Sequence, residues 1–330
     1  MEASTGSHSL VTVVTPVYNG AKTLAQCIES VLAQTYPNWE YIVVENRSTD
    51  GSRQIAERYA VSDPRIRVQV NADFVTAMEN HMIGFRGMSP ESRYCKVVQA
   101  DDWIFPECIE RMVAVAEAHP SVAMVSSYRL DEEWVTLDGL PYPSTFLPGR
   151  EICRRTLLDD IYVWGTPTSL LLRSDVIRAR DPFYDEALFP HHWDTAVCYE
   201  ILRDRDFGFV HQVLTFTRRE KAARTAESDR LGSMGPEHLL MLKRYGRWYL
   251  EAEEYRRRLE QRTRGYYRFL GTRAFLRPGR AFWEYHRRAL RDLDLPSGRV
   301  RLMKAAAGAA AGALASPARS FLRNLKRSET

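Results

Sequence analysis

Short apolar runs rich in β-branched residues recur along the first half of the chain, at residues 10–14, 41–44 and 96–98. Each run is bounded by turn-forming residues and predicts a buried strand. Between them, residues such as those at 24–31 place apolar side chains three and four positions apart, which predicts amphipathic helices. This alternation is typical of an α/β fold with a Rossmann-like, mostly parallel sheet flanked by helices.

The same patterns continue to about residue 216. They predict helices over residues 22–33, 52–59, 77–85, 106–119, 151–159 and 195–204. They predict further strands over residues 65–70, 122–126, 168–172 and 207–216. After about residue 228 the pattern becomes helical and basic. We therefore expect two domains, an α/β domain at 1–235 and a basic α-helical C-terminal extension at 236–330.

Polar and turn-forming residues follow three of the predicted strands, at 15–20, 45–51 and 99–103. Open α/β sheets bind their ligands at such strand ends. The last string contains two adjacent carboxylates, Asp101 and Asp102, and carboxylate oxygens are ligands of hard cations such as Mg²⁺ or Mn²⁺. The alternative is that this pair only begins a helix, because Asp caps helices and proline suits the first helical turn.

The composition narrows the class of protein. Of the 330 residues, 45% are hydrophobic and 27% are charged, which is the balance of a globular protein. No apolar run approaches the length of a membrane span, and the first eight residues are polar rather than typical of a signal peptide. The five cysteines fit neither a zinc pattern nor a disulfide framework. We therefore expect a cytoplasmic protein.

Charge is distributed unevenly along the chain. Residues 240–330 contain 22 Lys and Arg against 8 Asp and Glu, although the whole chain carries only +4. Aromatic residues are interleaved with these basic ones: Trp248, Tyr266, Tyr267, Phe269, Phe275, Phe282 and Trp283. Such basic amphipathic helices predict peripheral binding to an anionic membrane surface, with the aromatics at the headgroup level. The alternative is a solvated helical face packed on the α/β domain; no nucleic-acid-binding motif accompanies the charge.

The three polar strings, in this order and spacing, resemble the family 2 glycosyltransferases with the GT-A fold. That family opens with a strand, Pro-x-Tyr-Asn-Gly and a helix, as residues 16–20 do here, and the string at 32–40 is also similar. The resemblance covers roughly residues 9–220. It implies an inverting transferase that uses a nucleotide-diphospho-sugar and a divalent cation, Mg²⁺ or Mn²⁺.

The resemblance also implies residues of the nucleotide pocket. Thr15, Pro16 and Tyr18 would lie in the pocket, where the Tyr ring can form a wall against a base or ribose. Glu45 stands where the family usually has an Asp that contacts the base. A glycine is common at the position of Arg47, so this residue departs from the family pattern.

For the cation, the resemblance implies Asp102 as the first ligand. Asp101 would contact the ribose or a metal-bound water, and is the second candidate for the metal site. Many members of the family carry a further Asp at the position of Gln99, and Gln adds no charge there. The Asp pair itself is present, so the metal site remains the expectation.

For the general base, the family commonly shows an acidic residue at a segment that corresponds to residues 189–195. Its usual acidic pair aligns near His191 and His192, so Asp194 is the nearest carboxylate and our first candidate to accept the acceptor's proton. His192 is the rival base, and the alternative for Asp194 is a helix cap. Residues 164–169 resemble the acceptor- and sugar-facing region, with a plain strand entry as the alternative.

The leading hypothesis is a hexosyltransferase of polysaccharide biosynthesis. It would move a sugar from a nucleotide-diphospho-sugar, with UDP-sugar favoured, to a hydroxyl of a glycan or a lipid-linked saccharide. One alternative is a catalytically silent sugar-nucleotide-binding protein. Another is a nucleotidyltransferase, which would need a Gly-rich basic loop that residues 19–22 barely supply. The sequence carries no signal for an oligomeric state.

Overall fold

The computed structural model describes residues 8–185, 187, 189–218, 224–275 and 278–296. The chain divides into two compact units, Met1–Lys221 and Ala222–Thr330. The boundary expected at residue 235 falls inside the second unit, within helix α9 (Met234–Tyr249).

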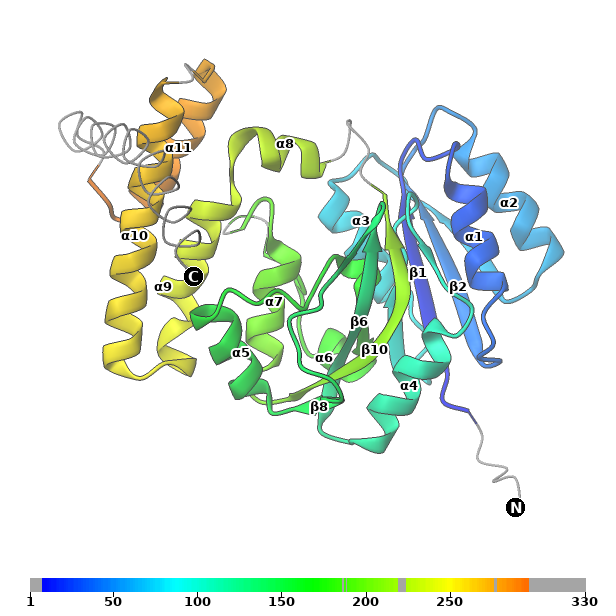
Figure 1. The fold of residues 1–330 in the computed structure, drawn as a ribbon. Helices are drawn as coiled ribbons and strands as arrows, with labels where there is room; N and C mark the ends of the chain where they lie inside the picture. The colour runs from blue at the N-terminus through cyan, green and yellow to red at the C-terminus, as the bar shows by residue number, and fades with distance from the viewer. Residues whose placement is uncertain (1–7, 186, 188, 219–223, 276–277, 297–330) are drawn as a thin grey trace, which may run out of the picture. The chain divides into compact units, whose positions relative to one another are not determined.

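The first unit is an α/β domain built on one sheet (Figure 1). Its strands are β1 (Val11–Val17), β2 (Trp39–Glu45), β3 (Ile66–Val70), β4 (Tyr94–Val97), β5 (Trp103–Ile104), β6 (Val122–Asp131), β7 (Trp134–Thr136), β8 (Phe146–Leu147), β9 (Leu171–Arg173) and β10 (Asp206–Thr217). Its helices are α1 (Leu24–Leu32), α2 (Ser52–Ser62), α3 (Ala77–Arg86), α4 (Cys108–Ala118), α5 (Gly149–Leu158), α6 (Ser174–Arg178) and α7 (Trp193–Ile201), with a 3₁₀ turn η1 (Pro167–Ser169). The predicted α/β fold class is confirmed.

The order of the main strands is β3-β2-β1-β4-β9-β6-β10-β5. β1 pairs in parallel with both β2 and β4, so the chain changes its direction of travel across the sheet at this point. β9 runs antiparallel to both β4 and β6, which leaves β6 and its parallel partner β10 pointing the same way as β4. The carboxyl ends of β1, β2, β3, β4, β6 and β10 therefore meet at one edge, where such sheets bind ligands.

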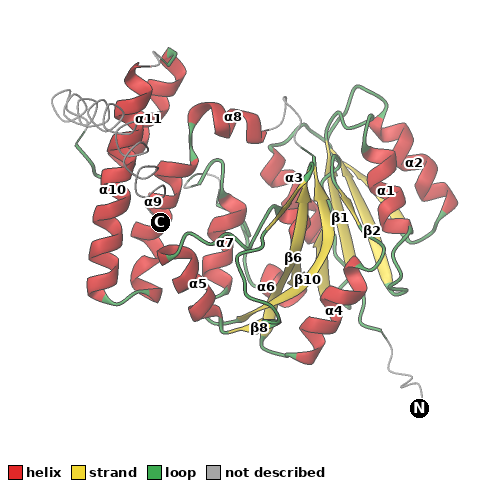
Figure 2. Cartoon of the chain, in the orientation of Figure 1, coloured by secondary structure: helices red, strands yellow, loops and turns green. Residues whose placement is uncertain are grey.

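Helices lie on both faces of the sheet (Figure 2). Val13 and Val43 belong to the core that α1, α2 and α4 cover. The opposite face packs against α3 so closely that a Cβ on Gly84 would lie 2.4 Å from Val14 Cγ1. Both faces are buried, which explains why these strands read as continuous apolar runs.

Two predicted elements differ from the structure. The strand expected over 168–172 begins as the turn η1, and only Leu171–Arg173 pairs as a strand. The strand expected over 122–126 continues to Asp131, because its polar second half pairs with β10 and β7. The second difference matters for function, since it brings β6 to the carboxyl edge of the sheet.

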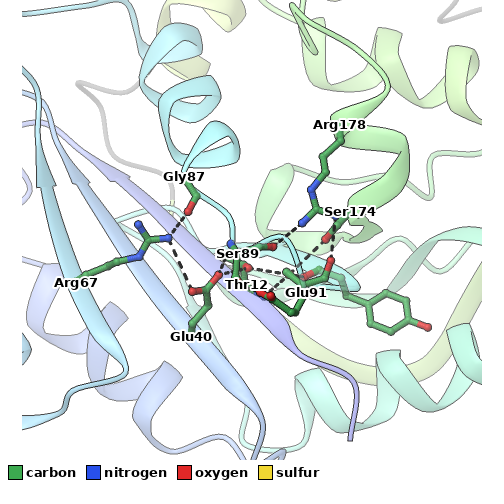
Figure 3. A network of polar contacts seen from close by, with 10 residues as sticks. Thr12, Glu40, Arg67, Gly87, Ser89, Glu91, Ser174 and Arg178 are labelled. Atoms are coloured by element: carbon green, nitrogen blue, oxygen red, sulfur yellow. Dashed lines mark hydrogen bonds and ion pairs between the residues drawn. The ribbon is translucent and has the colours of Figure 1, made fainter.

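A polar network holds the amino-terminal end of β1 (Figure 3). The hydroxyl of the fully buried Thr12 lies 2.6 Å from Glu40 Oε1 and 2.7 Å from Ser92 Oγ. Glu40 Oε1 also accepts the Ser89 N–H at 2.8 Å, and Arg178 donates to the Ser89 carbonyl at 2.6 Å. The network joins two strands, a loop and α6 at the edge opposite the polar strings, so its role is structural.

In its described residues, 224–275 and 278–296, the second unit contains α8 (Arg224–Leu231), α9, α10 (Ala252–Phe275) and α11 (Arg280–Asp292). His286 lies in its core, fully buried, with Nδ1 2.8 Å from the Tyr266 hydroxyl and Nε2 2.8 Å from the Leu231 carbonyl oxygen. Burial lowers the pKa of His286 to about 4, so the ring is neutral and structural. Among the described helices, none combines the length and the apolar character needed to cross a bilayer.

Three of the aromatic residues named for membrane contact are buried in this unit. Tyr266, Tyr267 and Phe282 are buried, and the other aromatics named for membrane contact that are described are half-buried: Trp248, Phe269 and Trp283. Phe275 has no described side chain. Tyr266, Tyr267 and Phe282 therefore belong to the packing of the helices, and contact of the half-buried rings with a lipid headgroup layer stays a prediction.

Candidate nucleotide and cation site

The loops that follow β1 and β2 are bound to each other at the carboxyl edge of the sheet. Asn19 has a φ of 51°, its N–H donates to Ser48 Oγ at 3.0 Å, and its Oδ1 accepts the Thr49 N–H at 2.8 Å. The Ala21 N–H donates to Asp50 Oδ2 at 2.9 Å. Hydrogen bonds therefore join two of the three polar strings, 15–20 and 45–51. The side chains of Asn19, Ser48 and Asp50 in these strings stabilise the loops.

Glu45 ends β2 and is only 1% exposed. Its Oε2 accepts the Arg47 N–H at 3.2 Å, and its Oε1 accepts the Ser48 N–H at 2.5 Å. Arg47 has a φ of 61°, in the left-handed region that favours glycine, which accounts for the glycine expected at this position. The Glu45 carboxylate thus holds the loop, and each oxygen has a further lone pair for contact with a base.

Two exposed aromatic rings meet at this edge. Tyr18 after β1 is 50% exposed and Phe74 after β3 is 62% exposed; their ring centroids lie 4.8 Å apart with planes inclined at 61°. Asn46 fixes the Phe74 loop, because its Nδ2 donates to the Val75 carbonyl at 2.9 Å and its Oδ1 accepts the Val75 N–H at 3.0 Å. The rings form a corner whose faces suit stacking with a flat base.

The first string also contains residues that face inward. Thr15 is fully buried and donates to the Val98 carbonyl at 2.7 Å, and Pro16 is buried beside it. The Thr15 side chain therefore has a structural role, and its place beside the nucleotide pocket stays a prediction. A Cβ on Gly20 would lie 3.4 Å from Ala100 Cβ, so this loop packs against the turn that carries the Asp pair.

Asp101 and Asp102 occupy that turn, directly after β4. Asp102 is 3% exposed; its Oδ1 accepts the Arg218 N–H at 3.0 Å and its Oδ2 accepts the Thr217 hydroxyl at 3.4 Å. Asp101 is half-buried, and its carbonyl accepts Arg218 Nε–H at 3.2 Å. The end of β10 therefore closes over the Asp pair from more than one hundred residues further along the chain.

Burial, together with the charge of Asp101, raises the pKa of Asp102 to about 7. Hydrogen bonds from Thr168 and from the Arg218 N–H act in the opposite direction, as does the Arg129 charge. Two adjacent carboxylates, one of them buried, repel each other, and a divalent cation bound to them would remove that repulsion.

The Asp pair fits a cation that shares its coordination with a substrate. Mg²⁺ is usually held by one or two carboxylates, with substrate phosphates and water as the other ligands. Within the described ranges, no three His, Cys, Asp or Glu side chains lie close enough together to enclose a metal ion. A cation on Asp101 and Asp102 would therefore take its remaining ligands from substrate and water.

Arg218 places a positive charge beside the same turn. Its guanidinium carbon lies 5.4 Å from the Trp103 ring centroid and 5.9 Å from that of Phe216, and these two rings stack on each other. Its Nη2 donates to Gln26 Oε1 at 3.0 Å. A guanidinium held in this way suits a phosphate oxygen.

The candidate bases lie at the start of α7. Asp194 is half-buried in its first turn, and its Oδ1 accepts the N–H of the next residue, Thr195, at 2.8 Å. The N-cap residue of this helix is His192, whose side chain makes no capping bond. Asp194 also lines a narrow, mainly apolar cavity between α7 and strands β4 and β9. His192 directly precedes the helix, and its carbonyl accepts the Ala196 N–H at 3.0 Å.

Arg129 is a buried charge that influences Tyr162 and Asp102. Burial raises the pKa of Tyr162, the Asp194 carboxylate adds to this effect, and the Arg129 guanidinium opposes it. Arg129 also lowers the pKa of Asp102. It is 7% exposed, and its Nη2 lies 3.1 Å from Asp131 Oδ2. Arg129 is therefore a buried guanidinium within electrostatic reach of the Asp102 carboxylate.

Two residues near the candidate site, Phe74 and Arg129, were not predicted from the sequence. Phe74 offered a signal, an aromatic residue just after a strand, whereas Arg129 offered none because its strand was expected to end at residue 126. Thr168, expected to face a sugar, is instead fully buried, and its Oγ1 accepts the Gln99 N–H at 3.0 Å. The acceptor-facing role of residues 164–169 is therefore corrected for Thr168.

Comparison with known proteins agrees with this arrangement. A family model described as Glycosyl transferase family 2 matches residues 12–174. The chain is 33% identical over 157 residues to EpsE of Bacillus subtilis, covering 45% of this chain and 55% of that protein. It is 32% identical over 145 residues to glycosyltransferase GlyG of Streptococcus pneumoniae, covering 44% and 46%. The chain thus spans about half the length of these curated relatives.

Solved structures share the fold at low sequence identity. S. aureus TarS 1-349 in complex with UDP-GlcNAc superposes with a TM-score of 0.63 at 15% identity, over 86% of this chain and 80% of that chain. Mannosyltransferase PcManGT from Pyrobaculum calidifontis, in complex with GDP-Man and Mn²⁺, gives a TM-score of 0.57 at 16% identity, over 96% and 79%. Together with the family match, they lead to one conclusion: this chain carries, in residues 12–174, a glycosyl transferase family 2 domain of the GT-A fold.

Proposed function

We propose that this chain transfers a sugar from a nucleotide-diphospho-sugar to an acceptor hydroxyl, with inversion at the anomeric carbon. The observation that carries the proposal is the Asp101–Asp102 pair, which lies at the same sheet edge as the exposed corner of Tyr18 and Phe74. The first feature suits a cation on a diphosphate and the second suits the base attached to it. The titles of the TarS and PcManGT complexes name UDP-GlcNAc and GDP-Man, which supports this class of donor.

In this proposal each polar group has a separate task. Asp102, with Asp101, would hold Mg²⁺ or Mn²⁺, which when bound neutralises charge on the departing diphosphate. Asp101 would also contact the ribose, and Arg218 would meet a phosphate oxygen. Asp194, or its rival His192, would accept the proton of the attacking hydroxyl. UDP-sugar is the favoured donor, and a glycan or lipid-linked saccharide is the proposed acceptor.

The test is release of nucleoside diphosphate from UDP-sugars and GDP-sugars with Mn²⁺, with Mg²⁺ and with a chelator, followed by NMR of the product anomer. We expect cation-dependent release and an inverted anomer. A retained anomer would exclude the inverting mechanism, and full activity in the chelator would exclude the cation. Pyrophosphate release from a nucleoside triphosphate and a sugar phosphate would indicate a nucleotidyltransferase, and tight binding without turnover a silent binder.

Replacement of the aromatic corner should weaken nucleotide binding. Base–aromatic stacking contributes about 1–3 kcal/mol, so Phe74→Ala should raise the Kd for UDP or GDP by roughly 5- to 150-fold. Isothermal titration calorimetry measures this. Tyr142→Ala is the matched control, because Tyr142 is 80% exposed and its ring contacts His211 rather than Tyr18. Equal affinity of the Phe74 and Tyr142 variants would exclude Phe74 from the base site.

The proposed contact of residues 240–330 with a membrane is supported mainly by their positive charge. The 22 basic residues of segment 240–330 remain, and part of them, in 297–330, lie outside the described residues. A basic residue near an anionic surface contributes about 1 kcal/mol, and salt screens it. The full-length protein should therefore pellet with anionic vesicles at low salt and not with neutral vesicles. Pelleting that is insensitive to salt, or absent at low salt, would contradict this.

A further inference from the structure

Lys96 is a charged residue in the middle of the sheet. It lies on β4 and is 0% exposed. Its Nζ donates to the Thr168 carbonyl at 2.5 Å and to the Leu170 carbonyl at 3.3 Å, and lies 3.7 Å from Met112 Sδ. A buried ammonium is costly unless its donors are satisfied. Here its partners are two backbone carbonyls at the turn η1, so the lysine fixes the position of that turn relative to β4.

Thr168 carries this constraint to the candidate cation site. Its Oγ1 accepts the Gln99 N–H at 3.0 Å. The Gln99 carbonyl in turn accepts the Asp102 N–H at 2.9 Å, closing the turn that holds both carboxylates. Thr168 is therefore bonded to the backbone of this turn at Gln99, and it also lowers the pKa of the Asp102 carboxyl.

We propose that Lys96 and Thr168 are positioning residues for the cation-binding carboxylate: the buried ammonium anchors η1, and the Thr168 hydroxyl, bonded to the Gln99 backbone, holds the turn that orients Asp102. The inference rests on the proposed function and adds two residues that touch neither nucleotide nor sugar. Groups that hydrogen-bond to metal ligands orient them, and their removal typically weakens metal affinity by roughly 10- to 100-fold. An ordinary core role for both residues predicts a loss of stability and no change in cation affinity.

The experiment measures Mn²⁺ affinity by electron paramagnetic resonance in the presence of UDP, together with the melting temperature of the cation-free protein. Thr168→Val should weaken Mn²⁺ binding by roughly 10- to 100-fold, and Thr168→Ser, which keeps the hydroxyl, should restore most of it. Lys96→Met should act in the same direction and also lower the Tm. Thr12→Val is the matched control, because it removes an equally buried hydroxyl at the opposite edge of the sheet.

Thr12→Val should lower the Tm and leave Mn²⁺ affinity unchanged. If Thr168→Val and Lys96→Met behave like Thr12→Val, the positioning role is refuted and the proposed function stands. If Thr168→Ser binds Mn²⁺ as weakly as Thr168→Val, the hydroxyl is not the cause and the inference also fails. If the wild-type protein with UDP binds no Mn²⁺, the cation part of the proposed function fails, and this inference fails with it.

Discussion

Asp102→Asn should reduce sugar transfer by at least about 10³-fold, because a bound cation supplies several kcal/mol of charge stabilisation in the transition state. The substitution keeps the shape of the side chain and an acceptor for the Arg218 N–H, but removes the charge. It should also abolish Mn²⁺ binding in the presence of UDP. Since burial and Asp101 disfavour the charged form of Asp102, the neutral amide should keep or raise the Tm.

The control for this variant is Asp206→Asn. Asp206 Oδ1 accepts the Gly149 N–H at 3.0 Å at the start of β10, at the opposite edge of the sheet, and an Asn can accept the same bond. Steady-state rates, Mn²⁺ titrations and thermal unfolding of both variants give the comparison. Similar activity of the Asp102 and Asp206 variants would show that Asp102 holds no essential cation.

Asp194→Asn should lower kcat by roughly 10²- to 10⁴-fold and leave the Kd for the nucleotide nearly unchanged, because it removes only the proton acceptor. The Asn substitution distinguishes the two hypotheses for Asp194, a general base and a helix cap. Asn caps helix starts about as well as Asp and can accept the Thr195 N–H, so a purely capping role predicts little change in either kcat or Tm.

His192→Gln is the companion variant for this test. If Asp194→Asn is fully active while His192→Gln has lost its turnover, the base is His192 and the assignment reverses. If both variants are active, neither Asp194 nor His192 is the general base. Because both residues lie at the start of one helix, thermal unfolding of each variant must accompany the kinetics.

Part of the candidate site could be predicted from the sequence because strand ends are local features. Tyr18 and Asp101 follow short apolar runs, and a parallel sheet brings such ends to one edge whatever the order of its strands. The burial of the Thr15 side chain could not be predicted, for a related reason. In a strand buried on both faces the apolar pattern does not show which way a given side chain points, and Thr15 points toward Val98 inside the core.

Other members of the site depend on contacts that no local pattern encodes. Arg129 reaches the carboxyl edge only because the polar second half of β6 pairs with β10 and with β7. In the sequence, Lys96 is a single charged residue in an apolar strand. Its role depends on its hydrogen bonds to η1, which lies more than seventy residues further along the chain. Both are buried charges whose partners are distant in sequence.

The sequence by itself determined the alternation of strands and helices, the polar strings at strand ends and the uneven charge, because each depends on residues close together in the chain. The tertiary structure decided which motif side chains shape loops, which face outward and which charges are neighbours. The Arg218 N–H meets Asp102 across 116 residues, and Tyr266, Tyr267 and Phe282 of the tail are buried. Such contacts depend on the pairing of distant strands and helices, where buried polar groups must find partners wherever the fold places them.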